Sequence, residues 1–378
     1  MRRAIILLVL PLVIIAIIEF WGLSAKANPG TSSANQKLTS KQQLGKKLFF
    51  DKNLSTPPGQ ACAECHAPEA GFTNPETSLP VSRGVYPDRF GKRNDLSAAY
   101  ASFIPEFHYD AAEKSYVGGC FWDGRAKNLV EQAKGPFLNS LEMANPDGAA
   151  VVEKVRKADY VAAFKEVFGQ DSLKDPNQAY NLIAEAIADY EKSSELNQFS
   201  SQYDLYVKGK VKLSAQELRG LALFEDKKKG NCAACHPVSG TEGAPALFSD
   251  FGYDNLGIPK NAESPFYYMP KSLNPDGVNA LDLGLGAVVK DPAQNGKFRT
   301  PSLRNAAKTA PYAHNGFFKN LRQIVAFYNT RDVGPWPPPE VPENVNREDM
   351  GNLKLTEQEV DDIVAFLNTL TDGYSPPK

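Results

Sequence analysis

The sequence predicts an all-α protein of two similar domains, each made of short helices joined by long loops. Three observations support this: one short motif occurs twice, the residues before each copy repeat, and the segments between the expected helices are rich in Gly and Pro. The chain has 378 residues, 42% of them hydrophobic, with a formal charge of −2, so it can bury two cores. This charge favours neither nucleic acid nor anionic lipid as a partner.

Each domain contains one Cys-x-x-Cys-His motif. The two copies are Cys62-Ala-Glu-Cys65-His66 and Cys232-Ala-Ala-Cys235-His236. Two thiols at this spacing bind the vinyl groups of a haem as thioethers, and the adjacent histidine is the proximal ligand of the iron. We therefore expect two cytochrome c-like domains, each with one covalent c-type haem. A zinc site built from both cysteine pairs is the alternative, but it does not explain why the same histidine follows each pair.

A similar helix is expected before each motif. Residues 38–49 and 213–224 have Leu, Gly, Leu and Phe at matching places. Each copy begins with a capping box, Thr39 with Gln42 and Ser214 with Glu217. Two unrelated helices would not be expected to share this pattern just before a haem motif.

Each domain should also end in a helix that packs over its haem. Thr356 and Glu359 form a third capping box, and the helix that follows has one apolar face, made of Val360, Ile363, Val364, Leu367 and Leu370. In the first half, Tyr180, Ile183, Ala184 and Ile187 have the same register. Four prolines around Trp336 exclude regular structure there. The domain boundary is expected near Ser200, which gives domains 28–200 and 201–378.

Residues 1–27 resemble a cleavable export signal. Arg2 and Arg3 precede an apolar run, and small residues follow at Ala25 and Ala27, so the mature chain would begin at Asn28. This predicts a periplasmic protein. Because the apolar run is almost long enough to span a bilayer, an N-terminal membrane anchor is the alternative.

Further motifs lie between and after the haem motifs. They are Phe121-Trp-Asp-Gly-Arg-Ala126, Glu131-Gln-Ala-Lys-Gly-Pro136, Leu141-Glu-Met143 and Thr309-Ala-Pro-Tyr-Ala-His-Asn-Gly316. In combination they resemble the bacterial dihaem cytochrome c peroxidase family, which includes MauG, over nearly the whole mature chain. The resemblance implies that the N-terminal haem meets peroxide and the C-terminal haem relays electrons, with Trp122 between them. It matches Glu142 to the distal carboxylate of the family, with Gln132 and Pro136 as its pocket neighbours.

A carboxylate at the position of Glu142 suits peroxide chemistry. Cleavage of the O–O bond needs a proton to leave the iron-bound oxygen and to reach the departing oxygen, and one general base and acid serves both steps. Glu142 can do this if partial burial keeps its pKa near the working pH.

The chain has only four histidines, so His108 and His314 are the two that remain as further iron ligands. Many members of the family carry a distal histidine in the loop that matches Arg83-Gly84-Val85, and this loop has none. His108 lies beyond Asn94, on the other side of the pattern. We therefore expect the first haem to be open to peroxide in the resting state. His314 matches a histidine of the family that is not an iron ligand.

The resemblance also implies ligands for the second haem and for calcium. It places Tyr328 where ordinary peroxidases of the family have methionine and where MauG has tyrosine. A phenolate stabilises oxidised iron and should lower the reduction potential. Met269 is the alternative ligand, if its loop folds back. A calcium ion between the domains would be held by the side chain of Asn94 and the backbone carbonyls of Thr309 and Pro311, oxygen donors that suit a hard cation.

We expect an enzyme, a periplasmic dihaem cytochrome c peroxidase that reduces hydrogen peroxide to water with electrons from a small redox protein, a cytochrome c or a cupredoxin. One alternative is a MauG-like enzyme that oxidises aromatic residues of a partner protein through a high-valent dihaem state, and Tyr328 is its main support. A dihaem electron-transfer cytochrome without catalysis is another. The resemblance allows a homodimer. Cys120 is interpreted as a buried small residue.

Overall fold

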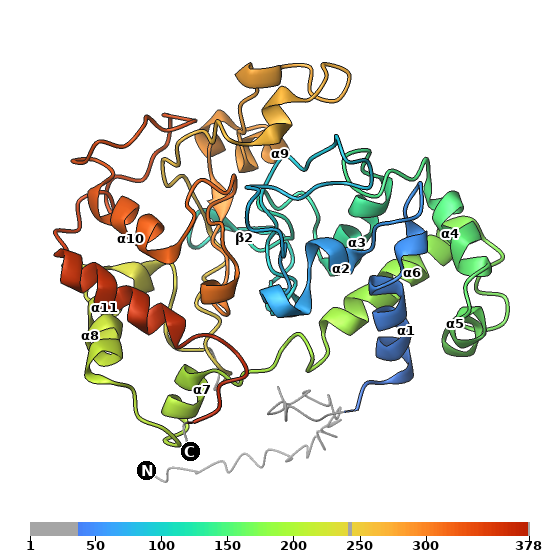
Figure 1. Ribbon diagram of the computed structural model, residues 1–378, viewed down its shortest axis with the longest axis horizontal. Coiled ribbons are helices and arrows are strands. Elements are labelled where there is room, and N and C mark those ends of the chain that lie inside the picture. The colour runs from blue at the N-terminus through green and yellow to red at the C-terminus, as the bar shows by residue number, and fades with distance from the viewer. Residues whose placement is uncertain (1–36, 241–243, 377–378) are drawn as a thin grey trace, which may run out of the picture. The chain divides into compact units, whose positions relative to one another are not determined.

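The computed structural model describes residues 37–240 and 244–376 of the chain (Figure 1). Its helices are α1 (Ser40–Phe49), α2 (Cys62–Cys65), α3 (Leu129–Leu138), α4 (Gly148–Arg156), α5 (Val161–Phe168), α6 (Pro176–Glu191), α7 (Gln202–Val207), α8 (Ala215–Glu225), α9 (Leu285–Val289), α10 (Leu321–Thr330) and α11 (Glu357–Asn368). Long loops join them, so the predicted fold class is confirmed.

Two short antiparallel strand pairs were not predicted. They are β1 (His108–Asp110) with β2 (Ser115–Val117), and β3 (Tyr253–Asp254) with β4 (Phe298–Arg299). Strands of two or three residues are too short to show the alternation of apolar and polar residues that identifies a strand in a sequence.

The repeated glycine allows two helix pairs to pack closely, α1 against α6 and α8 against α11 (Figure 1). A Cβ atom added at Gly45 would lie 1.9 Å from the carbonyl oxygen of Ala186 on α6. A Cβ atom added at Gly220 would lie 1.9 Å from the carbonyl oxygen of Asp362 on α11. No side chain fits at either distance, so glycine is required where the axes approach. The sequence repeat therefore encodes the same helix contact in both halves.

All three predicted capping boxes form. Thr39 begins α1, Ser214 begins α8 and Thr356 begins α11, and in each case the side chains satisfy free backbone amides at the helix start. A fourth capping box, Ser201 with Asp204, begins α7 and was not predicted.

Each half has its own apolar cluster. Buried residues of the first cluster come from the stretch between Leu44 and Leu196, and those of the second from the stretch between Tyr203 and Leu370. The apolar faces predicted for α6 and α11 contribute to these clusters. The boundary expected near Ser200 lies between the two stretches, and both halves belong to one compact unit.

The C-terminal segment connects the halves through a partly buried polar junction. The carboxylate of Asp372 accepts hydrogen bonds from the Tyr100 hydroxyl at 2.7 Å, the Ser200 amide at 3.0 Å and the Asn305 side chain at 2.9 Å. Charge-assisted bonds of this kind are stronger than neutral ones, so they fix how the second half meets the first.

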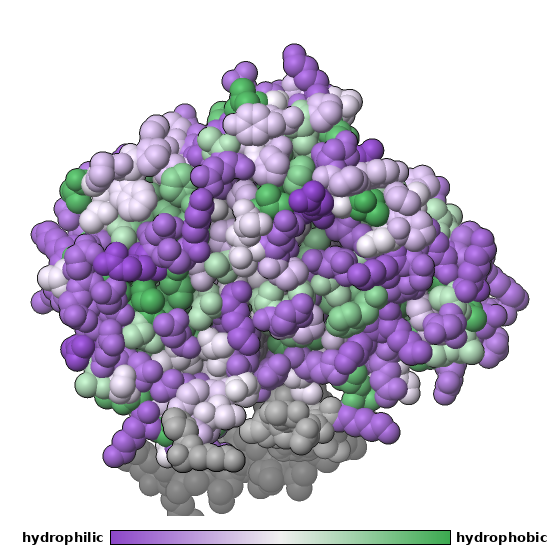
Figure 2. All heavy atoms as spheres, in the orientation of Figure 1, coloured by the Kyte–Doolittle hydropathy of each residue, from purple (hydrophilic) through white to green (hydrophobic). Residues whose placement is uncertain are grey.

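Across residues 37–240 and 244–376, no helix is long and apolar enough to cross a membrane. The predicted export signal at residues 1–27 lies outside the described residues. Figure 2 shows a face on which hydrophilic side chains predominate and apolar groups are scattered.

Candidate active site and haem pockets

The first motif forms one helical turn that faces a cavity. Cys62 and Cys65 begin and end α2, and the backbone amide of His66 donates to the Cys62 carbonyl at 2.9 Å. The Nδ1 atom of His66 donates to the carbonyl oxygen of Phe72 at 3.1 Å, which leaves Nε2 free to bind a metal. Burial lowers the pKa of His66, so the ring is neutral, as metal ligation requires.

The second motif has the same hydrogen bonds but a different local backbone conformation. Cys232 begins a 3₁₀ turn, and the amide of His236 donates to its carbonyl at 2.9 Å. The Nδ1 atom of His236 donates to the carbonyl oxygen of Phe248 at 2.7 Å, and burial lowers the pKa of this histidine as well. In both histidines a backbone carbonyl binds Nδ1, so Nε2 is the nitrogen that faces the cavity's iron position, although the local helices differ.

All four motif cysteines are free thiols. Burial raises the pKa of each thiol, to about 12 for Cys62 and Cys232, so the groups facing the cavities are neutral. The two pairs line different cavities, and no group of three or more His, Cys, Asp or Glu residues in the described chain could hold a metal ion. The zinc alternative needs the pairs to converge, and they do not.

Both cavities offer the groups that a covalent haem needs. The first has a volume of about 430 Å³ and the second about 210 Å³. Each offers two thiols for the vinyl groups and one imidazole for the iron. The walls include apolar side chains that suit a macrocycle, such as Phe49 and Ile187 in the first cavity and Phe224 and Leu367 in the second.

Three residues predicted for peroxide chemistry line the first cavity together with His66: Glu142, Gln132 and Pro136. Gln132 and Pro136 lie on α3, and Glu142 follows that helix in the chain. The side-chain amide of Asn139 donates to Oε1 of Glu142 at 2.8 Å. Burial raises the pKa of Glu142 above its ordinary value, and the nearby Asp95 carboxyl raises it further, while Arg125 and Asn139 oppose the shift.

Only the motif histidine, His66, is found among the side chains that line the first cavity. The loop at residues 83–85 packs against the backbone next to Glu142: the amide of Val85 donates to the Glu142 carbonyl at 2.9 Å. Gly84 allows this approach, because a Cβ atom there would lie 2.1 Å from the Leu141 carbonyl oxygen. His108 is exposed on β1 and lines neither cavity.

Trp122 lies in the wall that the two cavities share. Its ring is 9% exposed and lines both cavities. The Nε1 atom of Trp122 donates to the carbonyl oxygen of Asn94 at 2.8 Å. The backbone carbonyl of Trp122 accepts from the amide of Arg299 at 2.8 Å. One hydrogen bond therefore fixes the indole and the other fixes the backbone of Trp122.

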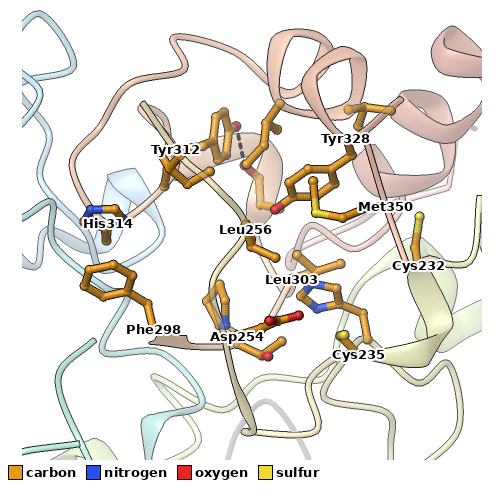
Figure 3. Close-up of a pocket in the computed structure, with 18 of the residues that line it drawn as sticks. Cys232, Cys235, Asp254, Leu256, Phe298, Leu303, Tyr312, His314, Tyr328 and Met350 are labelled. Carbon is orange, nitrogen blue, oxygen red and sulfur yellow. Dashed lines mark hydrogen bonds between the residues drawn. The ribbon is translucent and has the colours of Figure 1, made fainter. Parts of the chain in front are cut away.

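Tyr328 extends from α10 into the second cavity (Figure 3). Burial raises the pKa of its hydroxyl group well above 10. Met350 lies beside Tyr328 and also lines the cavity, and no role was predicted for it from the sequence. Met269, the alternative ligand, lies elsewhere: it packs against Phe266 and Tyr267, and its sulfur accepts from the amide of Phe90 at 3.3 Å.

The three residues predicted to bind calcium all line the second cavity, and two of them touch. The side-chain Nδ2 atom of Asn94 donates to the carbonyl oxygen of Pro311 at 2.5 Å, and its Oδ1 atom accepts from the amide of Asp95 at 2.8 Å. Thr309 lies two residues before that proline. His314 lies next to this group, since its carbonyl accepts from the amide of Asn94 at 2.8 Å. The ring of His314 stacks on Phe298 at 3.7 Å between centroids.

Two acidic residues of the first cavity were not predicted from the sequence. Asp95 lines both cavities and accepts a hydrogen bond from Ser82, and burial raises its pKa to about 7. Glu191 is 5% exposed, its Oε2 atom has no hydrogen-bond partner, and burial raises its pKa to about 8. Its position, four residues after Ile187 on the apolar face of α6, is the sequence signal that could have revealed it. Cys120 is buried, as expected, and lines the first cavity.

Comparison with known proteins agrees with this arrangement. The family model for di-haem cytochrome c peroxidase matches residues 39–212, and the model for cytochrome c matches residues 218–371. The chain is 39% identical over 355 residues to the methylamine utilization protein MauG of Paracoccus denitrificans, covering 88% of this chain and 89% of that one. The chain belongs to the dihaem cytochrome c peroxidase family. Its two cytochrome c-type domains therefore bind two haem c groups.

Other members of the dihaem cytochrome c peroxidase family are nearly as similar. The cytochrome c551 peroxidase of Pseudomonas aeruginosa is 32% identical over 348 residues, covering 92% of this chain and 83% of that one. The crystal structure of the dihaem peroxidase BthA from Burkholderia thailandensis superposes with a TM-score of 0.78 at 36% identity, covering 89% of this chain and 87% of that one. These relatives include both MauG and peroxidases, so the family alone does not decide between the two activities.

Proposed function

We propose that this protein is a periplasmic dihaem peroxidase that reduces hydrogen peroxide to water at the first haem, with electrons that arrive through the second. The observation that carries the proposal is Glu142, a carboxyl with a raised pKa in a cavity that has the proximal His66 and no second histidine among its lining residues. The bound haem supplies the iron at which the peroxide binds and its O–O bond is broken.

Glu142 moves the proton that this reaction needs. Its carboxylate takes a proton from one oxygen of the peroxide and then gives it to the other, which leaves as water. Because Asn139 donates to Oε1, the Oε2 atom is left to carry the proton. The raised pKa makes Glu142 a better base than an exposed glutamate, and Gln132 on the same wall offers an amide donor to the bound oxygens.

The reaction consumes two electrons and two protons for each hydrogen peroxide and releases two waters. We infer that a small redox protein, a cytochrome c or a cupredoxin, supplies the electrons one at a time. Trp122 supports a path from the second haem to the first, because its ring lines both cavities.

Tyr328 favours a second candidate function, the oxidation of aromatic residues on a partner protein. Tyr328 enters the second cavity from α10, while Met269 lies outside that cavity. A phenolate ligand would lower the potential of the second haem, which disfavours uptake of electrons from a high-potential donor. The identity of 39% to MauG also supports this candidate.

Two measurements on the haem-loaded protein separate the candidates. Steady-state oxidation of a reduced cytochrome c or cupredoxin by hydrogen peroxide supports the peroxidase. The second candidate is favoured by two results together. Oxidation of the donor is no faster than without the enzyme, and mass spectrometry finds added oxygen or a crosslink on aromatic residues of a co-purifying protein. A protein that does not react with peroxide at all contradicts both and favours a plain electron-transfer cytochrome.

We also propose a calcium ion at Asn94, Thr309 and Pro311. Segments more than two hundred residues apart meet there, where the Asn94 amide nitrogen donates to the Pro311 carbonyl. With the side-chain amide turned over, the Oδ1 atom of Asn94 and the carbonyl oxygens of Thr309 and Pro311 would provide the hard donors that calcium prefers. Calcium would hold the geometry between the two haems, since Trp122 is hydrogen-bonded to the carbonyl of Asn94. We also propose, from the resemblance and the sequence, that the protein is exported with cleavage after residue 27 and that it forms a homodimer.

A further inference from the structure

One buried arginine of this protein differs from the others. Arg299, Arg304 and Arg331 are all nine-tenths or more buried. Arg304 forms a two-pronged ion pair with Asp204, with both N–O distances at 2.9 Å, and Arg331 pairs with Asp332. Arg299 has no carboxylate within 4 Å among residues 37–240 and 244–376. A buried charge without a partner is strongly unfavourable, so an anion is expected beside Arg299.

The hydrogen bonds of Arg299 leave much of its guanidinium unused. Its Nε atom donates to the Phe121 carbonyl at 3.4 Å, and Nη1 donates to the Thr300 carbonyl at 3.3 Å. Both bonds are long. A guanidinium has five N–H donors, and the protons of Nη2 find no acceptor in the described chain. Burial lowers the pKa of Arg299, with only the Tyr253 hydroxyl and the Cys120 thiol near enough to oppose it.

The position of Arg299 indicates what the anion is. The residue is on β4, and its side chain lines both haem cavities. Its backbone amide donates to the carbonyl of Trp122, so it belongs to the same wall between the haems. Haem c carries two propionate groups, which are planar carboxylates of the shape that a guanidinium binds through two parallel hydrogen bonds.

We propose that Arg299 is the cationic partner of a haem propionate, and that this ion pair lies in the wall between the two haem cavities. Arg299 would therefore hold one haem in position and set its reduction potential. The positive charge offsets the propionate and favours the reduced iron. The inference rests on the presence of two haem c groups and does not depend on which reaction they catalyse.

A crystal structure of the haem-loaded full-length protein tests the contact directly. We expect guanidinium nitrogens of Arg299 about 2.7–2.9 Å from the oxygens of one propionate. If every propionate is bound elsewhere and Arg299 faces a protein carboxylate or water, the proposal is wrong. This test uses the wild-type protein, so it does not depend on the folding of a variant.

Reduction potentials test the consequence. In a spectroelectrochemical titration of the ferric protein, Arg299→Gln should lower the ferrous-to-ferric ratio of one haem at least tenfold at a fixed potential, a downward shift of about 59 mV for a one-electron couple. Arg299→Lys keeps the charge and should restore most of the potential. Arg331→Gln removes another buried guanidinium, one that lines neither cavity, and should leave both potentials unchanged.

The outcomes separate this proposal from the proposed function. Unchanged potentials in Arg299→Gln, at full haem content, would overturn the ion pair whether or not the protein reduces peroxide. A shift in Arg331→Gln as large as that in Arg299→Gln would show a general effect of charge removal and would also overturn it. No peroxide is used in the titration, so loss of peroxidase activity cannot produce either result.

Discussion

Replacing Glu191 by glutamine should make the protein less sensitive to alkaline pH. The Glu191 carboxyl lies on α6, is 5% exposed and has an Oε2 atom without a hydrogen-bond partner. Burial raises its pKa from an ordinary 4.5 to about 8. The folded protein therefore holds a proton at neutral pH that the unfolded chain has released.

The magnitude follows from the linkage between proton binding and folding. The stability associated with the neutral carboxyl is fully present below pH 4.5 and is lost as the pH rises through 8. Each pH unit in that range costs about 1.4 kcal/mol, so the loss by pH 8 is on the order of 5 kcal/mol. Glutamine has a similar shape and does not ionise, so the Glu191→Gln variant should not suffer this loss.

Guanidinium unfolding of the haem-loaded protein, followed by circular dichroism at pH 4.5, 6 and 8, measures the effect. The free energy of unfolding of the variant, relative to wild type, should rise with pH by several kcal/mol. Glu185→Gln on the same helix is the control, because that side chain is 42% exposed and paired with Lys41 at the surface, where such pairs contribute little. A difference between Glu191→Gln and wild type that stays constant with pH would refute the reasoning and show that the bound haem gives Glu191 a polar partner.

Three further predictions concern packing, catalysis and the metal site. Gly220→Ala should lower the free energy of unfolding by at least the 1–3 kcal/mol typical of overpacking, because the new Cβ atom would lie 1.9 Å from the Asp362 carbonyl oxygen; thermal unfolding measures this. Glu142→Gln should slow the reaction with hydrogen peroxide by about 10²–10⁴-fold, the usual contribution of a general base, and stopped-flow absorbance measures this. Removal of calcium by a chelator should slow electron transfer between the haems, and added calcium should restore it, whereas Asn94→Ala should abolish the restoration.

Two of these predictions have a matched control variant. Gly91→Ala places a Cβ atom 3.5 Å from its nearest neighbour and should be tolerated. Glu131→Gln changes an exposed carboxyl on α3 and should leave the peroxide reaction unchanged. An equal loss of stability in Gly220→Ala and Gly91→Ala would contradict the packing prediction. Equal rates of reaction with peroxide in Glu142→Gln and Glu131→Gln would contradict the catalytic prediction. A purified protein without calcium would contradict the prediction on the metal site.

The local features of this protein could be predicted from its sequence, because short-range chemistry determines them. The two haem motifs, the three capping boxes and the apolar faces of α6 and α11 depend on residues within a few turns of one another. The roles of Trp122 and Glu142 were predicted from the resemblance to a family, because no sequence spacing predicts that an indole lies between two haems.

The remaining features depend on contacts between distant segments. Met350 lies in an irregular segment without periodicity, so nothing in the sequence places it beside Tyr328. Arg299 follows the first haem motif by more than two hundred residues, and the wall that it shares with Trp122 exists only in the folded chain. The repeated glycines are visible in the sequence, but the helices that pack against them, α6 and α11, lie more than a hundred residues further along the chain.

An open first haem with Glu142 beside it is the central feature of the proposed peroxidase. Electron paramagnetic resonance and optical spectra of the resting ferric protein, before and after one equivalent of hydrogen peroxide, test this claim. We predict one high-spin haem beside one low-spin haem that lacks the sulfur-to-iron near-infrared band, and a rapid spectral change when peroxide is added. Two six-coordinate low-spin haems that do not react with peroxide would contradict it.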